Sequence, residues 1–305
     1  MSRGEIGRSP STQLPPSVKL GWVKIVLVSD THLAPRATAF RKNWDVIARW
    51  IEELRPDLVV HLGDITVDGM SDPGELRAAR AVFDLLTVPI RFIPGNHDVG
   101  DNPLATGPSG DHPLDLARLT VYRDLFGADR WALDADAWQI VALNAQLFGT
   151  GIAEEEEQFR WLEARVGKRE GPLGLLLHKP LFRDGPSDTQ VHVRYVPAKP
   201  RQRLLALLSK RELHFVATGH VHQARRIAVD GVVYAWAPST AYCFPDAMQE
   251  RIGEKTVGAL MLELEGHSHR FTLVIPAGLA RHDILEHPEV YPEVKAITAA
   301  TSPSR

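Results

Sequence analysis

Six short apolar runs recur along the chain, and each ends at a polar turn. The runs are KIVLVSD (24–30), DLVVHLGD (57–64), IRFIPGN (90–96), WQIVALN (138–144), LGLLLHK (173–179) and HFVATGH (214–220). Unbroken apolar runs of this length are typical of strands covered on both faces, since a strand with one solvent-exposed face alternates apolar and polar residues. The pattern therefore predicts a sheet buried between other layers.

Segments with a helical period lie between these runs. The apolar residues of segment 40–54 fall on one face of a helix: Trp44, Ile47, Trp50, Ile51 and Leu54. Segments 74–86 and 154–166 behave likewise. Strands that alternate with helices indicate an α/β fold.

From about residue 213 the pattern changes to strands joined by tight turns. Asp230-Gly231 between two β-rich runs is a strong hairpin signal, and Gly266 lies between two further runs. An αβ part followed by a β-rich part predicts sheets packed face to face with helices outside. We expect a folded domain over 23–276, a flexible leader over 1–22, and no element that can be placed in the tail 277–305.

Composition and charge exclude several classes of protein. A formal charge of −3 gives no basic field to hold a nucleic-acid backbone, so nucleic acid is not expected as a partner. Cys243 is the only cysteine, which excludes an intrachain disulfide and a thiolate metal cage and favours a cytoplasmic location. No apolar run approaches the ~20 residues that span a bilayer, so no membrane association is expected.

The ends of the predicted strands carry histidine, aspartate and asparagine. The candidates are Asp30, His32, Asp64, Asn96, His97, Asp98, His178, His220 and His222. Ligand sites of open α/β sheets lie beyond the carboxyl ends of the strands, so these side chains are expected to converge on one crest. The pairs 30/32 and 220/222 point to the same side if the chain stays extended there.

These donors have the chemistry of a metal centre. Oxygen and imidazole ligands without sulfur suit Mn, Fe, Zn, Co or Ni, and a carboxylate can bridge two ions about 3.5–4 Å apart. Six or more candidates exceed the four ligands of a structural zinc site. We therefore expect two metal ions that hold a hydroxide for attack on a phosphoryl group.

The ordered motifs D-x-H, G-D, G-N-H-D, H and G-H-x-H resemble those of the calcineurin-like metallophosphoesterases over residues 24 to about 245. SDTHL, GNHD, GHVH and STAYCF are similar in particular to bacterial class III cyclic-nucleotide phosphodiesterases and related glycerophosphodiesterases. The resemblance implies a four-layer α-β-β-α sandwich of two mixed β-sheets flanked by helices, with the metal site at the C-terminal crest of the strands. It also implies two divalent or mixed-valence ions, with Mn, Fe or Zn expected, and a small-molecule phosphate ester as substrate.

The same resemblance assigns roles to the residues. It implies that Asp30, His32 and His222 hold one metal, that Asn96, His178 and His220 hold the other, and that Asp64 bridges them. His97 is implied to face the substrate phosphate as a hydrogen-bond donor, or as proton donor to the leaving oxygen. Asp98 is expected to orient a neighbouring imidazole.

Other polar residues near these motifs have plainer interpretations. Lys179, where many relatives have a second histidine, is expected either to meet a phosphate oxygen or to point to solvent. His61 is expected on the side of its strand away from the ligands, in a structural role. His267 and His269 are expected to be exposed at a hairpin turn.

Several activities share such a metal core. A phosphodiesterase is the leading hypothesis, and a phosphomonoesterase or a nucleotide pyrophosphatase stays open because the rim loops 100–118 and 183–199 would choose the substrate. Some relatives keep the fold as a protein-interaction module. Residues 246–305 are open to a role as a cap or as a homodimer contact, although 251–266 reads more like strands that rejoin the core sheet.

Overall fold

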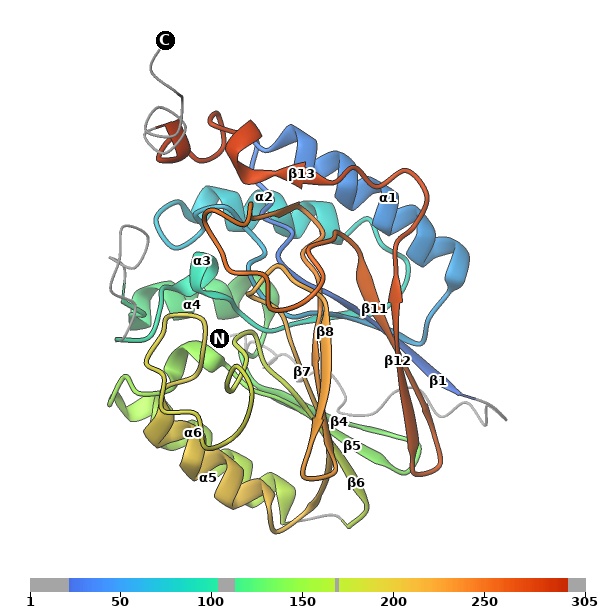
Figure 1. Cartoon of the computed structure of the whole chain (residues 1–305), viewed down its shortest axis with the longest axis vertical. Coiled ribbons are helices and arrows are strands. Elements are labelled where there is room, and N and C mark those ends of the chain that lie inside the picture. Colours follow the sequence, from blue (N-terminus) through green and yellow to red (C-terminus); the bar gives the residue numbers. More distant parts are fainter. Residues whose placement is uncertain (1–21, 104–112, 168–169, 296–305) are drawn as a thin grey trace, which may run out of the picture.

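The computed structural model of the chain describes residues 22–103, 113–167 and 170–295 (Figure 1). The predicted leader lies outside this part of the chain except for Trp22, and so does the middle of the loop 100–118. Within the described ranges, every helix is too short or too polar to serve as a membrane span.

A five-stranded mixed sheet is built around the first strand, in the order β12-β11-β1-β2-β3. Its strands are β1 (Val23–Val28), β2 (Leu58–His61), β3 (Ile90–Phe92), β11 (Ala259–Glu265) and β12 (Ser268–Val274). The first three are parallel, whereas β11 runs antiparallel to β1 and β12 antiparallel to β11. The prediction that the chain near 259–265 rejoins the core sheet is confirmed.

A six-stranded mixed sheet has the order β4-β5-β6-β7-β9-β8. Its strands are β4 (Trp131–Ala135), β5 (Trp138–Ala142), β6 (Pro172–Leu176), β7 (Glu212–Thr218), β8 (Arg225–Val229) and β9 (Val232–Trp236). Asp230 and Gly231 join β8 to β9 with φ of 51° and 80°, as a hairpin turn with two left-handed residues requires. The predicted hairpin is therefore confirmed.

The two sheets pack face to face over an apolar core. In β1, Ile25 and Leu27 face Trp138 and Phe215 of the second sheet in one buried cluster. The alternate residue Val26 faces the helices instead. Because both faces of β1 are covered, the strand reads as an unbroken apolar run.

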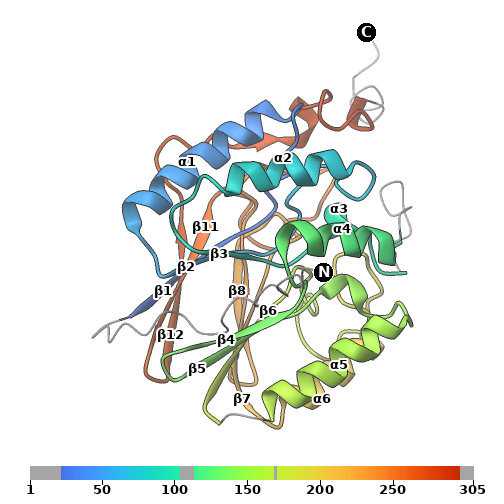
Figure 2. The same ribbon diagram turned by 180° about the vertical axis from the view of Figure 1, so that it is seen from behind.

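Helices cover the outer face of each sheet (Figures 1 and 2). The five-stranded sheet is covered by α1 (Thr38–Leu54), α2 (Pro73–Phe83) and α4 (Leu116–Phe126), and the six-stranded sheet by α5 (Ala153–Val166) and α6 (Ala198–Leu208). The short helices α3 (Asn96–Val99) and η1 (Ala145–Leu147) follow β3 and β5. The predicted four-layer sandwich is confirmed.

The chain beyond residue 276 packs back on the domain, where the sequence placed no element. Strand β13 (His282–Asp283) pairs with β10 (Tyr242–Cys243) and leads into η2 (Ile284–Glu286). Figure 1 shows this segment running beside α1. Val290, Tyr291 and Val294 share a buried cluster with Phe40 and Tyr242, so the segment is part of the folded body as far as it is described.

Candidate metal centre

Three of the strand ends that carry predicted ligands, those of β1, β2 and β7, leave the sheets through left-handed backbone. The φ angles are 54° at Asp30, 44° at His32, 52° at Asp64, 69° at His220 and 54° at His222. These are five of the eight non-glycine residues with positive φ in the described ranges. Asp30 and His32 fall in one group of candidate ligands, whereas His220 and His222 fall in two different groups. Both pairs lie in left-handed backbone and not in the extended chain that we expected. Such conformations cost about 1–3 kcal/mol each and gather at functional sites.

Gly95 lets two of these strand ends approach each other. Its own φ is −104°, which any residue adopts. A Cβ at this position would overlap the backbone nitrogen and the carboxylate of Asp64. The glycine in GNHD therefore serves close packing of the loop after β2 against the loop after β3.

The first group of ligands consists of Asp30, His32 and His222, whose ligand atoms lie within 4.8 Å of one another. His222 donates its Nδ1 proton to the carbonyl of Tyr242 at 3.0 Å, so its Nε2 carries a lone pair. That Nε2 lies 3.2 Å from Nε2 of His32 and 3.3 Å from Oδ1 of Asp30. Oδ1 of Asp30 is buried and has no hydrogen-bond donor in the described structure. The imidazole nitrogens and the carboxylate oxygen of this group thus face one another as hydrogen-bond acceptors, an arrangement that a cation bound between them would stabilise.

The second group brings together Asp64, His178 and His220, again within 4.8 Å. His178 donates from Nδ1 to the carbonyl of Leu62 at 2.8 Å. Its Nε2 then faces three acceptors: Oδ2 of Asp64 at 3.3 Å, Oδ1 of Asn96 at 3.3 Å and Nδ1 of His220 at 3.1 Å. The geometry repeats that of the first group and fits a second cation.

The two groups are joined to each other. Oδ2 of Asp30, in the first group, accepts from the backbone N–H of His220 in the second at 3.0 Å. The predicted ligands therefore meet at one crest. That Asp64 bridges two ions stays a prediction.

Burial and charge favour a neutral imidazole at two of the predicted ligand histidines and a protonated one at a third. Burial lowers the pKa of His32 and of His220 well below the usual value. For His178 burial is outweighed by the carboxylates of Asp64 and Asp30, which raise its pKa to about 9. A proton on His178 then compensates the buried carboxylates as a metal ion would, and metal binding must displace it.

His97 lies at the edge of the centre and is partly exposed. Its Nδ1 donates to the carbonyl of Val67 at 2.6 Å, and its ring centroid is 4.8 Å from that of His32. Its backbone N–H donates to Oδ1 of Asp64 at 3.0 Å. The ring is thus fixed beside the predicted ligands through Nδ1, and the role of Nε2 toward a substrate stays a prediction.

Asp98 does not orient an imidazole, and that expectation is wrong. Its carboxylate accepts from the backbone N–H groups of Gly95, Ile65 and Thr66 at 2.9–3.0 Å and from the hydroxyl of Thr66 at 2.9 Å. It holds the loop after Asp64 against helix α3, and so it positions the site through the backbone.

Three other histidines can be compared with their predictions. His61 is buried, contacts the hydroxyl of Thr31 at 2.9 Å and accepts from the N–H of Gly63 at 3.1 Å, in agreement with a structural role. His267 is exposed, as expected. His269 is half-buried against the ring of Trp138, so the prediction of full exposure is wrong there.

Lys179 is fully buried, so the expectation that it points to solvent is wrong, whereas contact with a phosphate oxygen stays a prediction. Its Nζ forms an ion pair with Asp101 and donates to Oδ1 of Asn102 at 2.6 Å. Burial lowers the pKa of Lys179, and Asp101 opposes this effect. The lysine thus ties the end of β6 to the start of the loop 100–118.

We expect Lys179→Met to lower the free energy of unfolding by about 3–5 kcal/mol, because it leaves the Asp101 carboxylate buried without its partner. Urea unfolding followed by circular dichroism measures the change. The matched control is Arg41→Ala, which breaks the exposed Arg41–Asp45 pair and is expected to cost under about 1 kcal/mol. Equal losses in the two variants would contradict the buried ion pair.

One residue at the centre, Tyr291, could not be predicted from the sequence. Its hydroxyl lies 2.7 Å from Nδ1 of His32, and the side chain is buried. It belongs to the C-terminal segment, far from every motif. The other ligand histidines are held through backbone carbonyls, so Tyr291 completes the set of outer contacts that orient the imidazoles.

Tyr291→Phe is expected to weaken metal binding at the first group by about 10–100-fold, because outer contacts of this kind fix the ring and its tautomer. Calorimetric titration of the metal-depleted protein with Mn²⁺ measures the affinity. Tyr234→Phe, at a buried tyrosine in the outer core of the six-stranded sheet, is the control and should leave the affinity unchanged. Unchanged affinity in Tyr291→Phe would show that the tyrosine only packs.

One of the predicted rim loops reaches the centre. Nε2 of His220 lies 3.3 Å from the carbonyl of Val193, in the loop 183–199, and donates to it. A change in the conformation of this loop would therefore directly affect the hydrogen bond of a predicted ligand, His220.

Comparisons with known proteins agree with this geometry. The profile of the family described as calcineurin-like phosphoesterase matches residues 23–224. The chain is 27% identical over 229 residues to the probable glycerophosphodiester phosphodiesterase GpdQ of Arcobacter nitrofigilis, covering 72% of this chain and 78% of that one. It is 25% identical over 258 residues to a probable cyclic nucleotide phosphodiesterase of Synechococcus, covering 80% and 88%.

A solved structure shares the fold. The dimetal phosphatase of Danio rerio superposes with a TM-score of 0.51 at 15% identity, covering 84% of this chain and all of that one (100%). The family profile spans more than half of the chain and includes every predicted ligand. The chain therefore belongs to the calcineurin-like phosphoesterase family.

Proposed function

We propose that this metal-dependent phosphoesterase is a dinuclear hydrolase of phosphodiesters. The observation that carries the proposal is the pair of facing acceptor groups, in which Nε2 of His178 and of His222 each lie 3.3 Å from a carboxylate oxygen. Buried acceptors at this separation repel unless a proton or a metal ion lies between them. The chain has two such groups of acceptors, and Asp30 connects them, so the two groups could bind two neighbouring metal ions.

Each side chain has a part in the proposed reaction. Asp30, His32 and His222 would hold one ion, Asn96, His178 and His220 the other, and Asp64 both. When bound, the ions supply Lewis acidity at the phosphoryl oxygens and lower the pKa of water. His97 would donate from Nε2 to the phosphate or to the leaving oxygen, and Asp98 would keep Asp64 and His97 in register.

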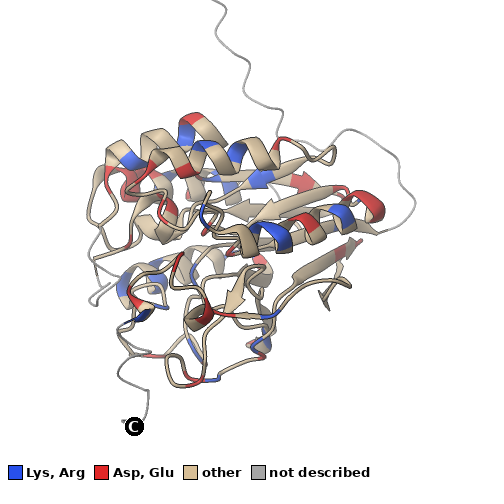
Figure 3. Cartoon of the chain, turned by 90° about the horizontal axis from the view of Figure 1, so that it is seen from above, with Lys and Arg blue, Asp and Glu red and all other residues tan. Residues whose placement is uncertain are grey.

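The preference for a diester and for a small molecule rests on two further observations. The two sequence relatives described above are named as probable phosphodiesterases. Figure 3 shows Lys and Arg interspersed with Asp and Glu along the ribbon, and the formal charge of −3 supplies no basic field for a nucleic-acid backbone. A reducing cytoplasm stays our expectation for the location, from the single Cys243.

The test is hydrolysis by the metal-depleted protein, with and without added Mn²⁺, of a chromogenic phosphodiester and of the matching monoester. Turnover that depends on Mn²⁺ and favours the diester is the expected result. A preference for the monoester would replace the proposal with a phosphatase. Full activity without metal would overturn it, and no turnover of either ester would favour the protein-interaction alternative.

A further inference from the structure

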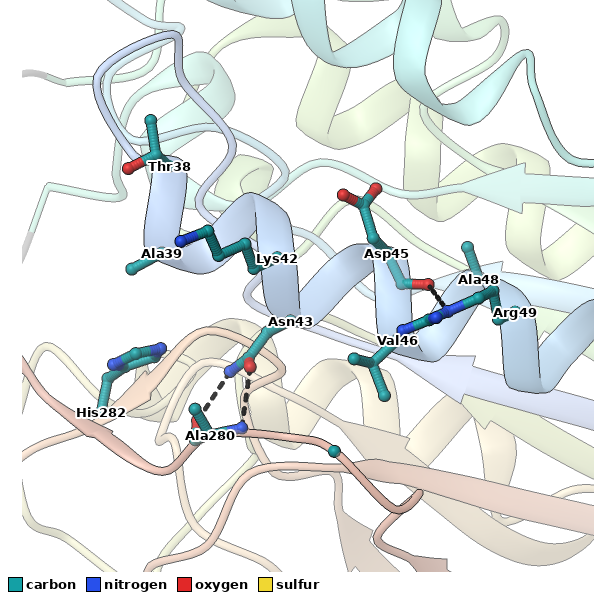
Figure 4. Close-up of a pocket in the computed structure, with 11 residues that line it drawn as sticks. Thr38, Ala39, Lys42, Asn43, Asp45, Val46, Ala48, Arg49, Ala280 and His282 are labelled. Atoms are coloured by element: carbon teal, nitrogen blue, oxygen red, sulfur yellow. Dashed lines mark hydrogen bonds between the residues drawn. The ribbon is translucent and has the colours of Figure 1, made fainter.

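A second cluster of metal-binding side chains lies on the C-terminal segment. One ligand atom from each of His282, Glu286 and His287 lies within 4.8 Å of the other two. Asn43 of helix α1 fixes this segment, since it donates to the carbonyl of Ala280 at 2.8 Å and accepts from its N–H at 3.0 Å (Figure 4). The cluster is thus held by the fold and is not carried on a free tail.

His287 is oriented as metal-binding histidines are. Its Nδ1 lies 3.0 Å from Oε1 of Glu289, a carboxylate that accepts the Nδ1 proton and leaves the lone pair on Nε2. The residue is only 8% exposed, and Nε2 is buried without a hydrogen-bond partner among the described residues. A buried polar atom without a partner is rare in native proteins, and a bound cation would satisfy it.

The charges around the cluster also suit a cation. Glu286 and Glu289 supply negative charge. Lys42 opposes a cation from helix α1, but it is exposed and can turn to solvent.

We propose that His282, Glu286 and His287 bind a transition-metal ion, with Zn²⁺ as the best fit. Two imidazoles and one carboxylate are a ligand set of zinc sites with three protein ligands, in which water takes the fourth position. His282 lines a groove of ≈ 760 Å³ between α1 and the C-terminal segment, which gives the ion access from solvent. The ion would join β13 to η2, directly before the turn that carries Tyr291.

Zinc content measured by mass spectrometry after equilibrium dialysis tests the proposal. Wild-type protein is expected to hold about one zinc ion more per chain than His282→Gln or Glu286→Gln. His267→Gln, at an exposed histidine outside the cluster, is the control and should match wild type. Because the result is a difference between variants, it does not depend on how many ions the main centre holds. Equal content in wild type and both cluster variants would overturn the proposal.

A further variant keeps the test valid if His282→Gln and Glu286→Gln fail to fold. Lys42→Glu changes an exposed side chain and removes the opposing charge, so it should tighten zinc binding to the cluster several-fold without harm to the fold. The readout is the zinc concentration that half-saturates the additional ion during dialysis. No tightening in Lys42→Glu, together with equal content in the glutamine variants, would show that the cluster binds no metal.

Discussion

Asp64→Asn is expected to lower the rate of phosphate-ester hydrolysis by about 10³-fold or more, because loss of metal activation removes several kcal/mol of transition-state stabilisation. Asp64 is buried, and its two oxygens have different partners. Oδ2 faces Nε2 of His178 at 3.3 Å, and Oδ1 accepts from the N–H of His97 at 3.0 Å. Asparagine keeps the shape and one acceptor but removes the charge that would hold two cations. The measurement combines kcat with metal content, and we expect a loss of at least one ion per chain.

The control for this variant is Asp45→Asn, which removes an exposed carboxylate on helix α1 and should change neither activity nor metal content. Circular dichroism in the absence of metal separates loss of the centre from loss of the fold. If Asp64→Asn kept both ions and wild-type turnover, the central role given to this residue would be wrong.

Convergence of the ligands could be predicted because it follows from sheet topology. Asp30 and Asp64 follow parallel strands of one sheet and His178 follows a strand of the other, and ligand sites lie beyond the carboxyl ends of such strands. The family resemblance then supplied roles that spacing alone does not supply. The local geometry could not be predicted. Asp30 and His220 have left-handed backbone, but the sequence pattern, an apolar run followed by polar residues, is the same whether the backbone there is left-handed or extended.

Long-range contacts account for the remaining differences. Lys179 is buried because Asp101 and Asn102, far away in sequence, meet it. Tyr291 reaches His32 across a separation of 259 residues, from a segment without hydrophobic periodicity. A single sequence contains no record of such pairs. The region after residue 276 therefore looked featureless, although it completes the contacts around a predicted ligand.

His97→Ala is expected to lower kcat by about 10²–10⁴-fold, because it removes a proton or hydrogen-bond donor. Both metal ions should be retained, because the imidazole nitrogens of His97 belong to neither group of predicted metal ligands. Burial lowers the pKa of His97, but the Asp64 carboxylate and the Val67 carbonyl outweigh it, so the pKa is raised overall. A raised pKa favours the imidazolium form, in which Nε2 carries a proton. That proton is lost as the pH rises through the raised pKa, so activity should fall on the alkaline side, and this fall should be absent in the variant.

Two substrates decide between the two roles of His97. A diester with a nitrophenyl leaving group needs little help from an acid, whereas an alkyl leaving group needs a proton as the bond to phosphorus breaks. If His97 protonates the leaving oxygen, the variant should lose far more activity on the alkyl diester than on the nitrophenyl diester. Equal losses would assign His97 to a hydrogen bond with the phosphate itself, and wild-type rates on both substrates would remove it from the reaction.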